Sequence, residues 1–158
     1  MIEIFTDGAS SGNPGKGGYG IIMRLQGTSY EKTFSEGFRL TTNNRMELLA
    51  VTVALEKITK DRQDVIVYSD SKYVVEAINS KWIYGWEKKR FEKVKNPDLW
   101  IRFMKIYRKH NVSFRWIKGH QGHPENERAD KLATLAAKSE NLSIDTGYEN
   151  SMNGNNIF

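Results

Sequence analysis

Residues 2–38 of this chain read IEIFTDGASSGNPGKGGYGIIMRLQGTSYEKTFSEGF, and this stretch decides the class of fold. Its apolar, β-branched and aromatic runs are separated by glycine-containing turns, which is the pattern of consecutive strands. Connections this short join antiparallel neighbours. We therefore expect a meander of three antiparallel strands over 2–6, 19–25 and 29–38, with a glycine-rich turn over 8–20.

Beyond this stretch the chain alternates helical and strand patterns. Polar residues at 41–44 offer N-caps for a helix over 45–58, whose apolar residues occupy more than one face, so we expect it to be buried on most sides. An unbroken apolar run at 65–69 predicts a strand inside a sheet that is covered on both faces. Later segments predict helices over 71–78, 97–109 and 124–139 and a strand over 112–117.

This order predicts an α/β fold with a five-stranded mixed sheet and helices on both faces. Asp7 and Asp70 then lie towards the ends of neighbouring strands, where sites on such sheets are usually found. After Leu142 the composition shifts to Ser, Asn and Gly. We expect one domain over 1–148 and a disordered C-terminal tail over 149–158.

The composition describes an ordinary globular protein, with 39% hydrophobic and 27% charged residues. We expect no membrane span, because no apolar run reaches about 18 residues, and no secretion signal, because no basic-then-apolar leader is visible. The absence of cysteine excludes disulfides and thiolate metal sites and fits a reducing compartment. We therefore expect a cytoplasmic protein, and a monomer.

The net charge of +5 is unevenly distributed along the chain. Residues 143–158 contain Asp145 and Glu149 but no lysine or arginine, which leaves +7 on the first 142 residues. Positive charge of this size suits a polyanionic partner such as nucleic acid, although many basic proteins bind none.

Four carboxylates occupy positions that are hard to explain by structure alone. Asp7 and Asp70 follow apolar strands, Glu47 lies within an apolar helix, and Asp130 borders a stripe of alanine and leucine. Burying a lone carboxylate is costly, so such a group is usually neutralised by a partner. Any one of them could be a cap, a turn residue or half of a surface ion pair, but four together would make a site for hard divalent cations.

Oxygen ligands without cysteine favour Mg²⁺ or Mn²⁺ over Zn²⁺. Two such ions about 4 Å apart can activate a water and stabilise a leaving oxygen, so phosphodiester hydrolysis is the reaction that fits. His120 lies in a glycine-rich loop before the helix of Asp130. It could shuttle a proton, and the alternative is a surface or capping histidine.

Several motifs together resemble type 1 ribonuclease H, the bacterial ribonuclease HI group. They are Ile4-Phe5-Thr6-Asp7-Gly8-Ala9, Gly12-Asn13-Pro14-Gly15, Thr42-Asn43-Asn44-Arg45-Met46-Glu47-Leu48, Ser69-Asp70-Ser71 and the run from Lys118 to Asp130. They occur in the family's order between about residues 2 and 148. The resemblance implies a ribonuclease H-like fold and endonucleolytic, two-metal-ion cleavage of the RNA strand of RNA–DNA hybrids, leaving 5′-phosphate and 3′-hydroxyl ends.

The resemblance also implies roles for individual residues. The four carboxylates match the family's Mg²⁺ ligands, with Asp7 bridging two ions and Mn²⁺ as a substitute, and His120 matches its mobile catalytic histidine. The matching substrate-binding positions are Asn13 and Asn44 for RNA 2′-hydroxyls, and Thr42, Asn43 and Asn96 for a DNA phosphate or the groove beside it. Lys72 stands where relatives often have a glutamine that contacts RNA.

The segment from Trp82 to Trp100 resembles the basic protrusion of bacterial members, which grips the hybrid. Its charge comes from Lys88, Lys89, Arg90, Lys93 and Lys95, and the aromatic residues Trp82, Trp86 and Phe91 are interleaved with them. It is shorter than in the longer relatives, and Glu87 and Glu92 dilute its charge. A solvated helix face would have a similar composition.

Two other classes of protein remain open. One is another nuclease or transferase of this broad fold, such as an integrase or a proofreading exonuclease, and the other is a hybrid-binding module without activity. A labelled hybrid distinguishes them, because internal cuts in RNA indicate ribonuclease H and stepwise loss from a DNA end indicates an exonuclease. Metal-dependent turnover would exclude the binding module.

Overall fold

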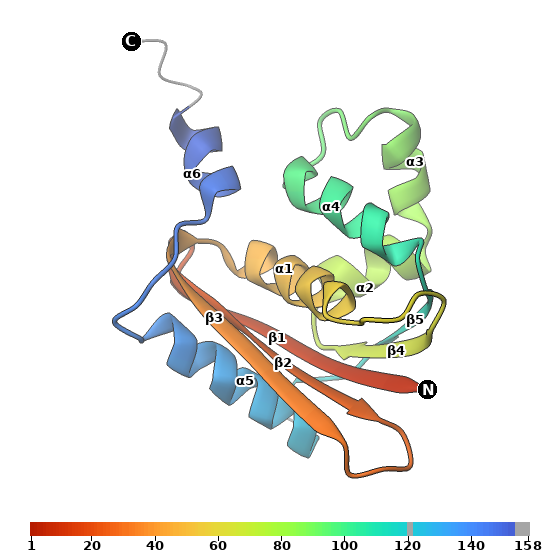
Figure 1. Cartoon of the computed structure of the whole chain (residues 1–158). Coiled ribbons are helices and arrows are strands. Elements are labelled where there is room, and N and C mark those ends of the chain that lie inside the picture. The colour runs from red at the N-terminus through yellow and green to blue at the C-terminus, as the bar shows by residue number, and fades with distance from the viewer. Residues whose placement is uncertain (120–121, 154–158) are drawn as a thin grey trace.

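The computed structural model describes residues 1–119 and 122–153 (Figure 1). The strands are β1 (Ile2–Gly12), β2 (Gly15–Leu25), β3 (Glu31–Thr41), β4 (Asp64–Ser69) and β5 (Asn111–Trp116). The helices are α1 (Asn43–Glu56), α2 (Lys72–Asn79), α3 (Trp82–Lys88), α4 (Pro97–Tyr107), α5 (Pro124–Ala137) and α6 (Thr146–Asn153). Among these helices, none combines the length and apolar character that crossing a membrane requires.

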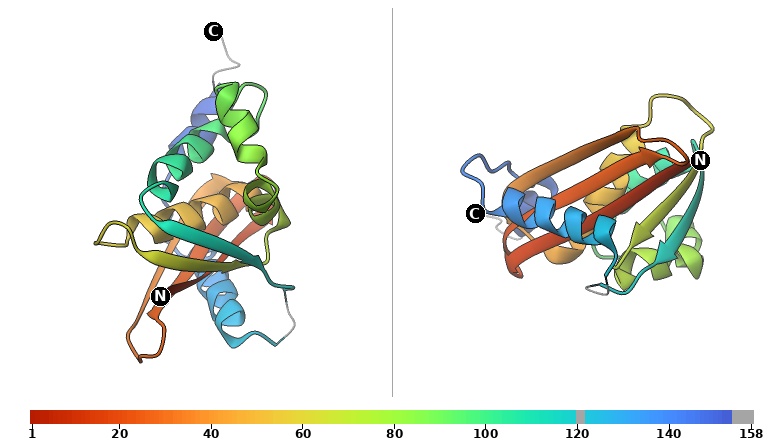
Figure 2. Two further views of the ribbon diagram at one scale, coloured as in Figure 1. Left: turned by 90° about the vertical axis from the view of Figure 1, so that its right-hand side faces the viewer. Right: turned by 90° about the horizontal axis from the view of Figure 1, so that it is seen from below.

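The strands form one mixed sheet in the order β3-β2-β1-β4-β5. β1, β2 and β3 pair antiparallel, whereas β4 and β5 run parallel to β1. Helix α5 covers one face of the sheet, and α1 and α2 cover the other (Figures 1 and 2). The predicted fold class is confirmed.

Side chains of β1 alternate between two hydrophobic clusters, as the period of a strand requires. Ile4 belongs to the large cluster that contains α1, whereas Phe5 packs with Ile22 and Ala129 in the smaller cluster beneath α5. Helix α1 is buried at every residue from Arg45 to Leu55, so its predicted burial on most sides is confirmed. The sheet and α1 thus form a rigid support for residues at the ends of both.

The predicted glycine-rich turn over 8–20 is wrong. β1 and β2 stay paired as far as Gly12 and Gly15, so the turn itself contains only Asn13 and Pro14. The other glycines of this stretch lie within strands, where glycine is ordinarily unfavourable.

Close packing of α5 explains the strand glycines. A Cβ atom on Gly20 would lie 2.2 Å from the carbonyl oxygen of Ala129, and one on Gly37 would lie 2.0 Å from that of Ala136. Real Cβ atoms do not approach backbone this closely, so only glycine lets α5 lie against the strands. The glycines of the strands therefore allow α5 to pack closely on the sheet.

The expected disordered tail over 149–158 is also wrong where α6 covers it, up to residue 153. The side chain of Asp145 accepts a hydrogen bond from the backbone N–H of Tyr148 at 3.2 Å, which is the interaction of an N-cap. Glu149 forms an ion pair with Arg39 on β3, at 2.8 Å. These contacts depend on residues far away in the sequence, so the local composition could not reveal them.

Candidate active site

Three carboxylates meet where β1 passes the carboxyl end of the neighbouring strand β4. The neighbouring parallel strands pair Phe5 with Tyr68, and Asp7 and Asp70 each follow two residues later. Glu47 reaches the same point from the second turn of α1. One carboxylate oxygen from each of the three acids lies within 4.8 Å of the others.

Asp130 completes this group from α5. It lines the same cavity as the other acids and interacts with the Asp7 carboxyl group. The structure therefore brings together the four acids that the sequence singled out. Asp7 lies in the middle of β1 and not near its end as expected, Asp70 follows β4, and Glu47 and Asp130 come from helices that pack against opposite faces of the sheet.

A glycine allows α1 to bring Glu47 this close. A Cβ atom on Gly8 would lie 2.5 Å from the backbone nitrogen of Glu47, so any larger residue would push the helix away from β1. The backbone N–H of Gly8 also donates a hydrogen bond of 2.9 Å to the Asp7 carboxylate.

Burial and mutual repulsion raise the pKa values of Asp7 and Glu47. Burial, and after it the neighbouring charge of Asp70, raises the pKa of Asp7 to about 8. Burial, followed by the Asp7 charge, raises the pKa of Glu47 well above its ordinary value. The Oε2 atom of Glu47 is buried and has no hydrogen-bond partner in the described part of the chain.

A divalent cation would neutralise the converging carboxylates and would coordinate the otherwise unpaired oxygen of Glu47. The donor atoms are all oxygens, and the chain has no cysteine. The residues present therefore fit a hard cation, which Asp7, Glu47 and Asp70 could hold together, with Asp130 beside them.

The predicted substrate-binding residues near α1 lie beside the acids. Asn43 and Asn44 line the same cavity. Asn13, in the β1–β2 turn, accepts a hydrogen bond of 3.1 Å from the backbone N–H of Asn43. Thr42 is the N-cap of α1, and its hydroxyl accepts from the backbone N–H of Arg45 at 3.2 Å. The β1–β2 turn and the start of α1 therefore form one surface.

Asn96 is linked to this cavity by a hydrogen bond to one of the residues that line it. Its side-chain amide donates to the Tyr73 hydroxyl at 3.0 Å and accepts from Arg45 at 3.3 Å. Tyr73 itself lines the cavity. Asn96 has a left-handed backbone conformation, with φ of 58°, at the start of α4. Its side chain is therefore held by both α1 and α2.

Trp116 lines the cavity and was missed by sequence reasoning. Its ring N–H donates a hydrogen bond of 3.1 Å to the main-chain oxygen of Asp70, and the Lys72 ammonium lies 5.1 Å from the ring centroid. Trp116 ends β5, where it pairs with Ser69 of β4. Its place at the end of the strand beside Asp70 is the signal that could have revealed it.

The expected basic protrusion consists of α3 and the turns that follow it. Trp82 is 52% exposed, whereas Trp86 is half-buried and packs edge-on against Trp100 with ring centroids 5.4 Å apart. The cations are exposed, but α3 ends at Lys88, so Lys89 and Arg90 follow the helix. The segment is therefore a short helix followed by turns, and its binding to the hybrid stays a prediction.

The chain approaches the acids once more just before the predicted histidine loop. A Cβ atom on Gly119 would lie 2.8 Å from the Asp70 carboxylate, so glycine lets the backbone pass close to it. His120 lies outside the described residues, and its role stays a prediction.

Comparisons with known proteins agree with this geometry. A family model described as RNase H matches residues 1–138. The ribonuclease H of Desulforamulus reducens is 53% identical over 149 residues, which cover 91% of this chain and 92% of the relative. The ribonuclease HI of Shewanella oneidensis is 51% identical over 154 residues, which cover 94% of this chain and 95% of the relative.

Solved structures show the same architecture. LC9-RNase H1, described as a type 1 RNase H with the type 2 active-site motif, matches with a TM-score of 0.79 at 30% identity over 95% of this chain and 79% of that chain. LC11-RNase H1, solved in complex with an RNA/DNA hybrid, matches with a TM-score of 0.62 at 30% identity over 87% and 97%. The chain therefore belongs to the RNase H family, in its bacterial type 1 branch, and is a nuclease and hydrolase.

Proposed function

We propose that this RNase H cuts the RNA strand of RNA–DNA hybrids internally, with two Mg²⁺ ions, and leaves 5′-phosphate and 3′-hydroxyl ends. The observation that carries the proposal is the convergence of Asp7, Glu47 and Asp70 within 4.8 Å, together with the unpaired buried oxygen of Glu47. The similar LC11-RNase H1 was solved with an RNA/DNA hybrid, which supports the choice of substrate.

Asp7 is suited to the central role among the ligands. Its carboxyl group interacts with Glu47, Asp70 and Asp130, so it is in contact with all the other acids of the site. Bound divalent cations would activate the attacking water and neutralise charge on the scissile phosphate. The protein holds the carboxylates at fixed positions, because they are anchored on β1, at the end of β4 and on α1. We assign to His120 the transfer of a proton near the same phosphate.

The surface around the acids offers groups that suit each strand of a hybrid. The amides of Asn13 and Asn44 can both donate to and accept from 2′-hydroxyls, which only the RNA strand possesses. Asn44 lines the cavity of the acids, and Asn13 lies in the turn beside the start of α1. We assign Thr42, Asn43 and Asn96 to a DNA phosphate or the groove beside it, because Thr42 and Asn43 lie at the start of α1 and Asn96 bonds to Arg45 of the same helix.

Cations beyond the acids would bind phosphates. Lys72 lies at the cavity rim beside Trp116, and the exposed side chains of Lys88, Lys89 and Arg90 extend the positive surface along the protrusion. We assign these cations, with Trp82 and Trp86, to the hybrid as well. Their contribution would be sequence-independent affinity, not selectivity for hybrid.

A uniformly labelled RNA–DNA hybrid tests the proposal directly. With Mg²⁺ we expect internal RNA fragments with 5′-phosphates, and with a chelator we expect none. Double-stranded RNA and double-stranded DNA of the same sequence are the controls and should stay intact. Stepwise loss from a DNA end, or turnover that ignores the chelator, would refute the proposal. Gel filtration tests the further expectation that the cytoplasmic enzyme is a monomer.

A further inference from the structure

Trp116 reaches the cavity of the acids from the edge of the sheet. It is the last residue of β5, the outer strand in the order β3-β2-β1-β4-β5, and it pairs with Ser69, the last residue of β4. Its side chain is 43% exposed. Tryptophan is highly buried on average, so a ring this open to a cavity calls for a reason other than packing.

The ring N–H of Trp116 extends the contact between β4 and β5 beyond the ends of both strands. The backbone N–H of Ile117 donates to the carbonyl oxygen of Ser69 at 2.9 Å, and the carbonyl oxygen of the next residue, Asp70, accepts from the Trp116 ring N–H at 3.1 Å. The second bond restrains the peptide group of Asp70. It therefore also restrains the direction in which the Asp70 carboxylate points.

Asp70 depends on such a restraint because it lies between two elements. It follows β4, and the next residue, Ser71, is already the N-cap of α2. The Ser69 hydroxyl accepts from the backbone N–H of Ser71 at 3.0 Å, so Ser69 holds one side of this connection and Trp116 holds the other. Mg²⁺ demands near-ideal octahedral geometry, so the direction of a ligand carboxylate affects metal affinity.

The face of the same ring holds a cation. The Lys72 ammonium lies 5.1 Å from the Trp116 ring centroid, which is within the range of a cation–π interaction. Among the residues that the structure describes, Lys72 forms no ion pair with a carboxylate. Both side chains line the cavity of the acids. The ring therefore keeps the ammonium at the cavity wall, where a phosphate of bound substrate would meet it.

We propose that Trp116 is a positioning residue with two tasks in the proposed hydrolysis, on which this inference rests. Its ring N–H fixes the metal ligand Asp70, and its ring face holds the Lys72 ammonium towards a substrate phosphate. The first contact contributes to metal affinity, and the second contributes to the electrostatic part of substrate affinity.

A base stacked directly on Trp116 matches the geometry less well. One face of the ring already contacts Lys72, and the bases of a duplex are stacked on one another. A ring that only fills the end of β5 would explain neither the bond to Asp70 nor the position of the ammonium.

Metal binding to the free protein tests the ring N–H. Trp116→Phe removes this donor and keeps an aromatic ring. Calorimetric titration with Mg²⁺, without substrate, should give a Kd about 10-fold higher for Trp116→Phe than for wild type. Lys72→Gln should not weaken Mg²⁺ binding, and neither should Tyr30→Leu, a change at an exposed aromatic residue outside the cavity. Equal Mg²⁺ affinity of Trp116→Phe and wild type would overturn the first task.

Hybrid binding in the presence of a chelator tests the ring face. Fluorescence anisotropy over a range of salt concentrations should give Lys72→Gln a log–log slope that is shallower by nearly one unit, whereas Trp116→Phe and the exposed control Lys105→Gln should keep the wild-type slope. Trp116→Leu, which has no aromatic face, should weaken binding in the same direction as Lys72→Gln. The variant with both changes should bind within about 2-fold of Lys72→Gln alone. Additive losses would mean that the ring contacts the substrate itself, and would overturn the second task.

Melting temperatures separate positioning from packing. Because Trp116 is partly exposed at the end of an edge strand, its variants should melt close to wild type, and Trp116→Met replaces Trp116→Leu in the same comparison if the latter does not fold. A wild-type protein that binds neither Mg²⁺ nor hybrid would refute the proposed function and this inference with it. Wild-type binding by every folded Trp116 variant would refute this inference alone.

Discussion

Asp7 interacts with every other acid of the site, and this central position makes it the most informative residue to change. Asp7→Asn keeps the shape of the side chain and removes one negative charge from between the proposed cations. We expect Mg²⁺-dependent hybrid cleavage to fall by more than about 10³-fold while circular dichroism stays unchanged. Asp61→Asn, at an exposed acid, is the control and should be fully active. Substantial activity of a folded Asp7→Asn protein would refute the central assignment.

His120 is expected to transfer a proton without holding a metal. His120→Ala should therefore slow turnover by about 10- to 10³-fold and leave a measurable rate. The pH–rate profile is the informative readout, because the limb that belongs to the histidine should disappear. His123→Ala, three residues further on and exposed, is the matched control. A His120→Ala profile that coincides with wild type would exclude a catalytic part for this loop residue.

At the residue scale, the sequence revealed those side chains whose chemistry conflicts with their surroundings. Asp7 and Glu47 stood out because a carboxylate among apolar neighbours has few structural explanations. Trp116 did not, because an aromatic residue at a strand end is equally typical of a core. The contacts of Asn96 with Tyr73 and Arg45 join three helices, so no local pattern contains them.

The α6 element depends on one buried ion pair. Asp145 is 7% exposed and lies 2.8 Å from the Arg45 guanidinium, and it also accepts from the Thr41 hydroxyl at 2.7 Å. Asp145→Asn should lower the free energy of unfolding by about 3 kcal/mol, because it leaves a buried cation with one partner fewer. Glu149→Gln, which breaks the exposed pair with Arg39, should cost much less. Urea titration measures both, and equal losses would contradict this account of α6.

The basic segment after α3 should contribute affinity without contributing to chemistry. Replacing Lys88, Lys89 and Arg90 together by Ala should raise KM several-fold at moderate salt and leave kcat nearly unchanged, because these residues lie away from the acids. Each lost phosphate contact should also reduce the log–log salt dependence of binding by nearly one unit.

A second triple variant provides the control for net charge. Replacing Lys105, Lys109 and Lys138 by Ala removes the same charge from exposed positions outside the segment and should leave the salt slope unchanged. If KM and the salt slope of the first triple variant equal those of wild type, the segment does not contact the hybrid.

At the element scale, the sequence predicted which strands and helices exist better than where they end. Helix α1 was recognisable from its caps and its apolar residues. Glycines at 18, 20 and 37 were mistaken for turn formers or passed over, because the sequence does not show that a helix packs directly on them. Their role is defined by α5, more than ninety positions away, and only the tertiary structure brings the two together.

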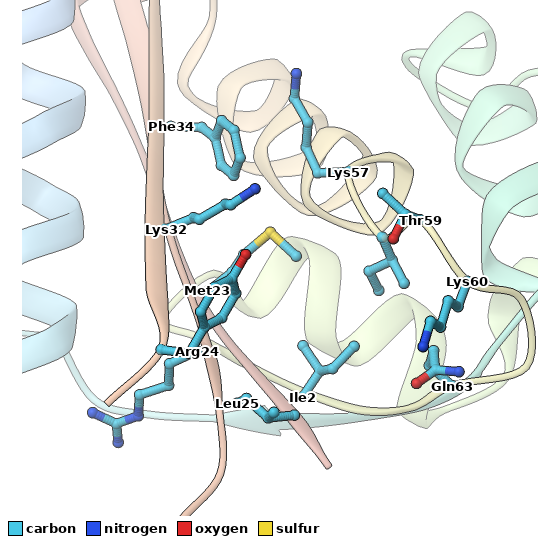
Figure 3. A pocket seen from close by; sticks show the side chains of 12 residues that line it. Ile2, Met23, Arg24, Leu25, Lys32, Phe34, Lys57, Thr59, Lys60 and Gln63 are labelled. Carbon is cyan, nitrogen blue, oxygen red and sulfur yellow. The ribbon is translucent and has the colours of Figure 1, made fainter. Parts of the chain in front are cut away.

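At the scale of the whole molecule, the order of the elements was enough to predict the sheet. A meander followed by strands that need helical crossovers leaves few topologies for five strands. A second hollow, lined by Ile2, Met23, Phe34 and Lys57 among others, could not be predicted (Figure 3), because it is formed by parts of β1, β2, β3 and the end of α1 that carry no distinctive motif. Surfaces of this kind depend on packing, whereas the acids were recognisable one at a time.

The buried acids should make the stability of the whole protein depend on pH and on metal together. Because the pKa of Asp7 is about 8 in the folded protein and lies near 3.9 in the unfolded chain, the folded state binds the extra proton between these values. The unfolding free energy of the metal-free protein should therefore fall as pH rises from about 4 to about 8. At pH 8, Asp7→Asn should be more stable than wild type by ~1 kcal/mol or more, and at pH 4 the two should be similar. Mg²⁺ favours the ionised acids, so it should raise the melting temperature of wild type at pH 8 and have little effect on Asp7→Asn. Thermal melts of both proteins across this pH range, with and without Mg²⁺, test the linkage, and parallel pH profiles of the two metal-free proteins would contradict it.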